Sequence, residues 1–548
     1  MRVWLLVLLL PTVMAQPQLS AVVPDLPGAH DHDEAVAVWS PTAWDLAGHG
    51  LTDGEDTWWF PDGAQLPANT ESWIVGNASA WALFDGPAPS WTFDLRLGNE
   101  GDDVTLLGPD GPLDAMAYDG AITTGKAQVL RPGEGWVTPR IHRLGESDLD
   151  APTFQGSVTA YASPDSSHRV LTGLMEGAQE RLHLHVYQLL SDDLVDRIVA
   201  AAERGVDVQV LVEDHPVGLD AEGRQAKNHA LQRIHEAGGQ TFEAGSVRYA
   251  FHHLKVLVAD DAVAVQSENW VATGVPADPS WGNRGWGAAI HDDEVADWFA
   301  EWMQTDRGAW DTAPVAPSGI EAPWQFPTAR GSYRPVASAT FDAVVRPFVS
   351  PDHTADPRHD PVLALIRNAT SAIDVQQLDL RLDASNRMGW QGPDGLTLAL
   401  ADAAQRGVQV RVQAASPFHH EDTGNRDAMA WLAEHGVKAA ELEREGIVTL
   451  HNKGLVIDER FVVLGSMNGN HHSRSNNREA GLILEGPEVA AYYGALFQSD
   501  WVVSTPVDWG QVARDLKEVP ASPWPILLAL TAVARLGCFP RSRTLHLP

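Results

Sequence analysis

Two short stretches of the chain carry the same side chains at the same spacing, and both have the chemistry to act on a phosphate ester. The residues are His253, Lys255 and Asp260 in the first stretch and His451, Lys453 and Asp458 in the second. In an extended segment, residues two apart project from the same face, so each histidine should project beside its lysine. A neutral imidazole is a competent nucleophile, and an imidazolium is a competent acid. The lysine ammonium adds positive charge and three donors for phosphate oxygens.

Neutral hydrogen-bond donors follow both motifs. Ser466 and Asn468 lie shortly after the second motif, and Asn269 lies at a similar place after the first. Their hydroxyl and amide groups can donate to the same phosphate oxygens as the lysines. The sequence therefore predicts a phosphate site built from these three residues and from Lys255 and Lys453.

The elements around the motifs are repeated as well. Residues Ala202–Val210 resemble Ala404–Val412, and Asn283–Gly287 resemble Asn477–Gly481. These pairs and the two motifs occur in the same order, at a near-constant offset of about 200 residues, which indicates an internal duplication. A single His-x-Lys pair on a strand is usually a solvated face. Its repetition on matched elements makes a functional site the better interpretation.

Each repeat is predicted to be an α/β unit. Leu182–Val186 is typical of a strand, residues 192–203 have helical spacing, and Val206–Val212 alternates as a strand. This β–α–β pattern predicts mixed or parallel sheets covered by helices. We place the first repeat at residues 150–312 and the second at 341–508. A Pro-rich linker at 313–340 joins them.

The second motif and its surroundings resemble the phospholipase D superfamily, because the spacing continues from Asp458 through Gly465, Ser466 and Asn468 to Glu479. The first half fits only through Asp260 and then departs, with Gln266 in place of the glycine and Gly285 in place of the glutamate. The resemblance covers roughly residues 155–505. It implies a pseudo-twofold site in one chain, a phosphohistidine intermediate, and no metal or cofactor. No dimer is needed to complete such a site.

The resemblance also implies different roles for the two histidines. Glu479 could accept a hydrogen bond from Nδ1 of His451 and fix its tautomer, as the third member of a triad does. We therefore predict His451 as the nucleophile and His253 as the acid that protonates the leaving oxygen. Asp260 and Asp458 are predicted to orient the structure and not to carry protons.

The N-terminal region, residues 16–145, is predicted to be an all-β sandwich. It is rich in Gly, Pro, Asp and Trp, with short alternating runs between turn signals such as Asp53-Gly54 and Asp110-Gly111. It resembles a lamin-tail-like domain, which is an immunoglobulin-like sandwich. The matching segments are Glu34–Pro41, Asp45–Gly48, Leu51–Gly54, Phe60–Gly63, Gly98–Leu106 and Asp110–Tyr118.

Both ends of the chain carry apolar segments. Residues 1–15 have a basic start, an apolar run and a small-residue end, which predicts a secretory signal peptide and an extracellular or cell-surface location. The tail, residues 509–548, holds a second apolar segment at 524–539. Its length is short of the ~20 residues that a spanning helix needs. Membrane anchor, processed sorting tail and docking helix remain open for it.

Composition and net charge narrow the classes of substrate. The net charge is −35, with 44% hydrophobic and 20% charged residues, and the single cysteine, Cys538, excludes an intramolecular disulfide framework. Strong acidity disfavours nucleic acid, because phosphate contacts need many Lys and Arg side chains. We predict an exported phosphodiesterase that hydrolyses or transfers a phosphatidyl group of phospholipid. The alternatives are a secreted nuclease and a surface binding or adhesion protein whose site has decayed.

Overall fold

The computed structural model describes most of the chain between residues 16 and 506. The described residues are 16–24, 34–82, 88–98, 101–119, 129–131, 135–137, 149–246, 248–309, 311–321, 331–355, 357, 360–382, 395–415 and 424–506. The predicted signal peptide at 1–15, the tail at 509–548 with its apolar segment 524–539, and Cys538 lie outside the described residues. Among the helices of the described part, none combines the length and apolarity that crossing a membrane requires.

The N-terminal region is β-rich, as expected, with two main sheets over one core. One sheet has the order β12-β11-β1-β2-β7-β8 and the other β10-β9-β4-β5. Side chains of both sheets, such as Val36 and Leu106, are fully buried in the same cluster. The immunoglobulin-like arrangement stays a prediction. The elements are β1 (Gln18–Val23), β2 (Ala35–Trp39), β3 (Trp44–Asp45), β4 (Gly50–Thr52), β5 (Thr57–Trp59), β6 (Gln65–Leu66), β7 (Ser72–Val75), α1 (Ala78–Ala82), β8 (Trp91–Thr92), β9 (Gly101–Gly108), β10 (Gly111–Asp119), β11 (Val129–Arg131) and β12 (Gly135–Val137).

The remainder of the described chain is an α/β unit built from two repeats. The first repeat contains β13 (Phe154–Ser163), α2 (Ser167–Gly177), β14 (Arg181–Val186), α3 (Asp192–Glu203), β15 (Asp207–Glu213), α4 (Ala221–Glu236), β16 (Gln240–Ala244), β17 (Lys255–Ala259), β18 (Ala262–Gln266), β19 (Gly282–His291), α5 (Asp293–Arg307) and β20 (Thr312–Pro314). The second contains β21 (Ala339–Ser350), α6 (Pro361–Asn368), β22 (Ala372–Gln377), α7 (Gly395–Gln405), β23 (Gln409–Ala414), α8 (Gly424–Glu434), β24 (Lys438–Glu441), β25 (Ile447–Leu450), β26 (Lys453–Ile457), β27 (Phe461–Gly465), α9 (His471–Ser475), β28 (Glu479–Glu485), α10 (Pro487–Trp501) and β29 (Thr505–Pro506).

The two repeats have the same sheet topology, which is the duplication expected from the sequence. In the first, the pairing runs β13-β19-β18-β17-β14-β15-β16-β20. In the second, it runs β21-β28-β27-β26-β22-β23-β24-β29. Only β14-β15-β16 and β22-β23-β24 are parallel within them, because those strands are joined by helical crossovers. The predicted mixed sheets are therefore present.

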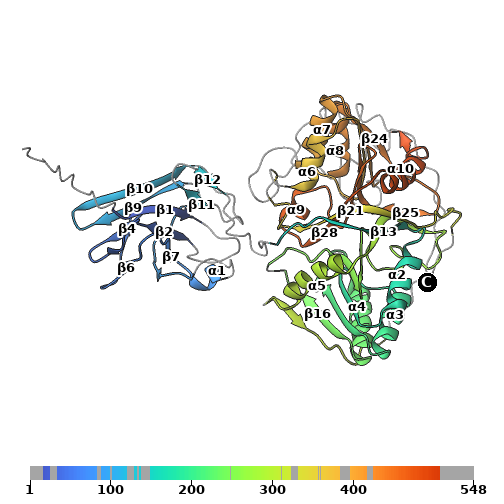
Figure 1. The fold of residues 1–548 in the computed structure, drawn as a ribbon, viewed down its shortest axis with the longest axis horizontal. Helices are drawn as coiled ribbons and strands as arrows, with labels where there is room; N and C mark the ends of the chain where they lie inside the picture. The colour runs from blue at the N-terminus through green and yellow to red at the C-terminus, as the bar shows by residue number, and fades with distance from the viewer. Residues whose placement is uncertain are drawn as a thin grey trace, which may run out of the picture.

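The repeats are joined through their first strands, so that they form one mixed sheet. β13 pairs antiparallel with β21 over seven residue pairs, from Phe154↔Val345 to Ala160↔Ala339. In Figure 1 the strands β13, β21 and β28 lie between the helices of the first repeat, coloured cyan to green, and those of the second, coloured yellow to red. The motif strands β17 and β26 are buried along their whole length. Such burial accounts for their nearly continuous apolar sequences.

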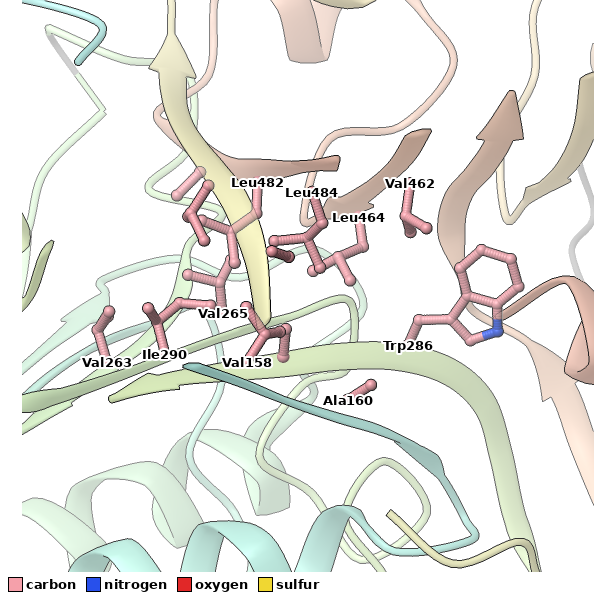
Figure 2. Packing of buried hydrophobic residues seen from close by; sticks show 14 of the residues in the cluster. Val158, Ala160, Val263, Val265, Trp286, Ile290, Val462, Leu464, Leu482 and Leu484 are labelled. Atoms are coloured by element: carbon pink, nitrogen blue, oxygen red, sulfur yellow. The ribbon is translucent and has the colours of Figure 1, made fainter. Parts of the chain in front are cut away.

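One hydrophobic core is shared by both repeats. Val265 of β18 and Trp286 of β19 belong to the same buried cluster as Leu464 of β27 and Leu482 of β28. Figure 2 shows these side chains gathered around the central strands. Because the interiors of folded proteins are close-packed, a shared core fixes the position of one repeat relative to the other. That rigidity matters for a site whose parts come from both.

The predicted linker at 313–340 is shorter than expected and partly anchored. Its first two residues belong to β20, and β21 already begins at Ala339. Tyr333 is buried and its hydroxyl lies 2.7 Å from both Asp165 and the Arg284 guanidinium. The proline pattern predicted a connection, but it gave no sign that one tyrosine would enter the buried part of the protein.

Candidate active site

Each motif histidine lies on a loop that immediately precedes a central strand. Lys255 is the first residue of β17, and Lys453 is the first residue of β26. Each ammonium donates to the carbonyl of its own motif histidine, at 2.7 Å for His253 and 2.6 Å for His451. Both lysine side chains are buried. In both halves the lysine therefore lies beside its motif histidine through the histidine's backbone carbonyl.

Each histidine loop is hydrogen-bonded to the other repeat. The backbone N–H of His253 donates to the carbonyl of Arg478 at 2.9 Å, and that of His451 donates to the carbonyl of Arg284 at 2.9 Å. Arg284 lies in β19 of the first repeat, and Arg478 immediately precedes β28 of the second. The two motifs are thus built into each other's repeats, which brings them to one site.

Glu479 pairs with His253 and not with His451, which corrects the expected pairing. Its Oε2 lies 2.8 Å from Nδ1 of His253, and its Oε1 accepts from the Asn477 amide at 3.0 Å. The cause is the exchange of loops between repeats, because the His253 loop is bonded to Arg478, the residue before Glu479. Fully buried, this carboxylate can hold the imidazole with its proton on Nδ1 and its Nε2 lone pair free.

His451 has a carboxylate partner that the sequence analysis missed. Its Nδ1 lies 3.0 Å from the carbonyl oxygen of Ser267, 3.2 Å from Nζ of Lys453 and 3.5 Å from Oε2 of Glu268. Glu268 is buried, and its Oε2 also accepts from the Asn283 amide at 3.1 Å. A signal was present: Glu268 is an acidic residue inside the Ser-x-Asn segment, where the second half has Met467.

Burial governs the charge of both histidines. It lowers the pKa of His253 to about 4, although the Glu479 carboxylate opposes that shift. Burial also lowers the pKa of His451, and there Lys453 adds to the shift while Glu268 opposes it. The lysine of each repeat lowers the pKa of the other repeat's histidine as well. Both rings are therefore neutral at pH 7 in the empty site, and groups of both repeats share one electrostatic environment.

The two buried lysines supply the cations of the site, and the two buried glutamates balance them. Burial lowers the pKa of Lys453 to about 8 and that of Lys255 well below its ordinary value, while Glu268 and Glu479 oppose both shifts. Glu479 itself has a lowered pKa: burial raises it, but His253 and Lys255 lower it by more. The result is a buried set of charges in which an added phosphate anion would find cationic partners.

The predicted phosphate-binding residues are placed differently from one another. Ser466 is fully buried, and its hydroxyl accepts from the Ala480 N–H at 3.0 Å and donates to the Ala480 carbonyl at 3.3 Å. It therefore joins the end of β27 to β28, and its role as a phosphate donor stays a prediction. Asn269 has its amide 3.4 Å from Gln188. Asn468 lines a small cavity together with Lys453, so it stays a candidate.

Asp260 and Asp458 accept hydrogen bonds from backbone groups, which suits the orienting role predicted for them. Asp260 accepts from the N–H groups of Gln179, Glu180 and Arg181, at 2.8 to 3.0 Å. Asp458 accepts in the same way from Thr370, Ser371 and Ala372, at 2.8 to 3.0 Å. These donors lower the pKa of both carboxyls. Each aspartate thus fixes the start of the strand beside its motif strand, β14 or β22.

A buried arginine supports each histidine loop. Arg478 donates to Asp306 of the first repeat at 2.7 Å and also pairs with Asp352 of its own repeat. Arg284 donates to Asp500 of the second repeat at 2.7 Å and pairs with Asp165. The two clusters are equivalent and each one spans both repeats. In the sequence, the repeated Asn-Arg pair is visible only as a sign of duplication.

A family model described as "Cardiolipin synthase, PLD-like domain" matches residues 171–307 and 362–501. The chain belongs to this family. Each matched range lies within one of the two structural repeats, so both repeats are of the PLD-like type. In the described part of the chain, no group of three or more His, Cys, Asp or Glu side chains is arranged to hold a metal ion.

The PLD-like chain is also similar to known proteins. Phospholipase D Z of Dictyostelium discoideum is 30% identical over 167 residues, which cover 28% of this chain and 38% of that protein. Phospholipase D Y of the same organism is 28% identical over 166 residues, covering 28% and 37%. These alignments span well under half of either relative. The crystal structure of phosphatidylserine synthase from Haemophilus influenzae Rd KW20 has a TM-score of 0.51 at 12% identity, covering 71% of this chain and 96% of that one, and shows the likeness of fold alone.

Proposed function

We propose that the chain is a phosphodiesterase of phospholipase D type, which hydrolyses or transfers a phosphatidyl group through a phosphohistidine. The observation that supports this most strongly is the pair of histidine–carboxylate contacts made across the two repeats, His253 with Glu479 and His451 with Glu268. An imidazole oriented by a buried carboxylate presents its other nitrogen to the substrate, as in a catalytic triad. Two such groups with two buried lysines suit a two-step displacement at phosphorus.

In this proposal His253 is the nucleophile, which reverses the assignment made from the sequence. Its Nδ1 contact to Glu479 is the shorter one, 2.8 Å against 3.5 Å for His451 and Glu268. The Nε2 lone pair of His253 attacks phosphorus while the bond to the leaving oxygen breaks. His451 gives its Nε2 proton to that oxygen. Neutral His451 then takes a proton from water, the water oxygen attacks phosphorus, and the P–N bond breaks. Lys255 and Lys453 neutralise the phosphate oxygens throughout.

Phospholipid is the substrate class that we favour. The similar curated proteins carry the name phospholipase D, and a net charge of −35 disfavours a long nucleic-acid groove. Export through residues 1–15 and a positioning role for the lamin-tail-like region are part of the same proposal. The proposed export would bring the enzyme to the outside of the cell, and the proposed positioning role would hold it near lipid head groups.

A substrate panel tests the proposal. The full chain would be assayed with bis(p-nitrophenyl) phosphate, phosphatidylcholine vesicles, phosphatidylglycerol vesicles and single-stranded DNA, at several salt concentrations. We expect turnover of the activated diester and of at least one lipid, with none by Lys453→Met. Cleavage of DNA without turnover of either lipid would overturn the lipid substrate. Failure with every diester would overturn the enzymatic proposal.

The reaction is expected to have an acidic pH optimum. His253 must be neutral to attack, so kcat/KM should rise with pH through about 4, the lowered pKa of this ring. His451 must carry a proton, so kcat/KM should fall as pH rises through its pKa, which lies below the usual 6.5. Above the pKa of His451, kcat/KM should fall about tenfold per pH unit, because kcat/KM reports the protonation state of groups in the free enzyme. The measurement is kcat/KM from pH 3.5 to 8.5, with circular dichroism as a control for unfolding. An optimum above pH 7 would contradict the assignment.

A further inference from the structure

The first repeat differs from the second at three positions that lie close together in space. Gln266 stands in place of Gly465, Glu268 in place of Met467, and Gly285 in place of Glu479. The changes at 268 and 285 make the two halves of the site unequal, because Glu479 at the start of β28 has no glutamate at the equivalent position in β19.

Glu268 fills the space that a side chain at position 285 would need. A Cβ atom on Gly285 would lie 2.2 Å from Oε1 of Glu268 and 2.5 Å from the hydroxyl oxygen of Ser267. Real Cβ atoms do not make such contacts, so with Glu268 and Ser267 in these positions only a glycine fits at 285. The two changes therefore belong together.

The displaced carboxylate keeps its hydrogen-bonding partner. In the second repeat, Asn477 donates to Glu479 at 3.0 Å, and in the first repeat the equivalent Asn283 donates to Glu268 at 3.1 Å. Both carboxylates are buried, and each faces Nδ1 of one motif histidine. Glu268 thus reaches the same kind of position from a different place in the backbone.

Gln266 holds the segment that carries Glu268. Its amide donates to the Glu268 carbonyl at 3.1 Å, and its Oε1 accepts from the hydroxyl of Tyr161 at 3.3 Å. All three residues are buried. The second repeat has Phe348 in the position of Tyr161, each ring packing on a glycine of the adjacent strand, and a ring without a hydroxyl matches the absence of a glutamine there. The change at 266 is thus part of the same rearrangement.

We infer that Glu268 is the positioning residue of His451, having taken over by relocation the role that Glu479 performs for His253. Building on the proposed function, it holds the His451 ring and stabilises the imidazolium that protonates the leaving oxygen. Gln266 and Gly285, which suggested a decayed site in the first repeat, are then part of the arrangement that gives the site its second carboxylate.

The test compares Glu268→Gln with the matched variant Glu479→Gln on diesters whose leaving groups differ in basicity. Phenyl and p-nitrophenyl leaving groups differ in their need for an acid, so a weakened acid slows the phenyl substrate selectively. For Glu268→Gln we expect the burst rate with the phenyl diester to fall on the order of 10²-fold, with a much smaller loss for p-nitrophenyl. For Glu479→Gln, which acts on the nucleophile, we expect similar losses with both. Glu485→Gln, which removes the partner of Arg346 and Arg460, should leave the leaving-group dependence unchanged.

The outcomes separate the inference from the function on which it rests. If the wild-type chain hydrolyses diesters and Glu268→Gln loses nothing with the phenyl substrate, or slows both substrates equally, the inference is wrong while the function stands. If the wild-type chain hydrolyses none, the proposed function itself fails. Should Glu268→Gln not fold, Glu268→Asp keeps the charge but draws it back from the ring, and the same selective loss is expected at smaller size.

Discussion

Replacing His253 with alanine is expected to lower kcat by at least about 10⁴-fold, because removal of a nucleophile leaves only binding and electrostatic stabilisation. The variant should also form no covalent intermediate. Wild-type protein mixed with a phosphorus-labelled p-nitrophenyl diester and quenched should carry acid-labile label on the peptide that contains His253.

His451→Ala should behave differently. A p-nitrophenolate ion leaves without an acid, so this variant should still accept the label. The intermediate should then persist, because no base remains to activate water. If His451→Ala loses turnover but keeps the label, and His253→Ala loses both, the two histidines have the different roles proposed for them. Label on the peptide that contains His451 would overturn the assignment.

A matched control is available outside the site. His183 also has a carboxylate partner, with Asp207 at 3.0 Å, but this pair lies partly exposed on β14 and β15. His183→Ala should keep labelling and turnover within a few fold of the wild type. A loss similar to that of His253→Ala would mean that the assay reports general damage to the fold and not removal of the nucleophile.

The second large effect is on stability. Arg478→Met is expected to lower the free energy of unfolding by about 3–5 kcal/mol, because it removes one cation from two buried carboxylates. Those carboxylates are Asp306 and Asp352, both fully buried as side chains. Thermal or denaturant unfolding of the purified chain measures the change. The loss should be accompanied by a loss of activity, because the carbonyl of Arg478 holds the His253 loop.

Two companion variants show whether the loss of stability in Arg478→Met comes from the buried charges that Arg478 neutralises. Arg460→Met removes an exposed guanidinium from Glu485, and pairs of that kind contribute about 0–1 kcal/mol. Adding Asp306→Asn to Arg478→Met removes one of the two buried charges that lost the Arg478 guanidinium and should recover part of the stability. If the double variant is no more stable than Arg478→Met, then lost packing and not buried charge is the cause.

Much of the fold could be predicted from local patterns. Near-constant offsets between Ala202–Val210 and Ala404–Val412, and between the two His-x-Lys pairs, predicted two copies of one α/β unit, and the strand pairings confirm it. Alternation and helix spacing depend on near neighbours in sequence, so they are visible in a single chain. The same spacing located the histidines and lysines of the candidate site.

The pairing of groups across the site could not be predicted in this way. Sequence comparison within one repeat assigned Glu479 to His451, but the histidine loops are exchanged between repeats, and long-range strand pairing decides which carboxylate meets which ring. Glu268 was missed for a different reason. Its carboxylate fills an equivalent place in space while standing at a non-equivalent position in the sequence, so comparison position by position showed a loss at 285 and no gain.

Carrying both repeats on one chain has a consequence for how such a site can be tuned. A homodimer of identical repeats would place the same residues on both sides of its axis, and its two histidines would begin with identical surroundings. Here the counterpart of Glu268 is Met467, and that of Gly285 is Glu479. Each half can therefore accumulate substitutions that suit one imidazole alone. Because the two repeats are covalently linked but differ in sequence, the surroundings of each histidine can change independently. One ring can then be adapted to attack phosphorus and the other to donate a proton.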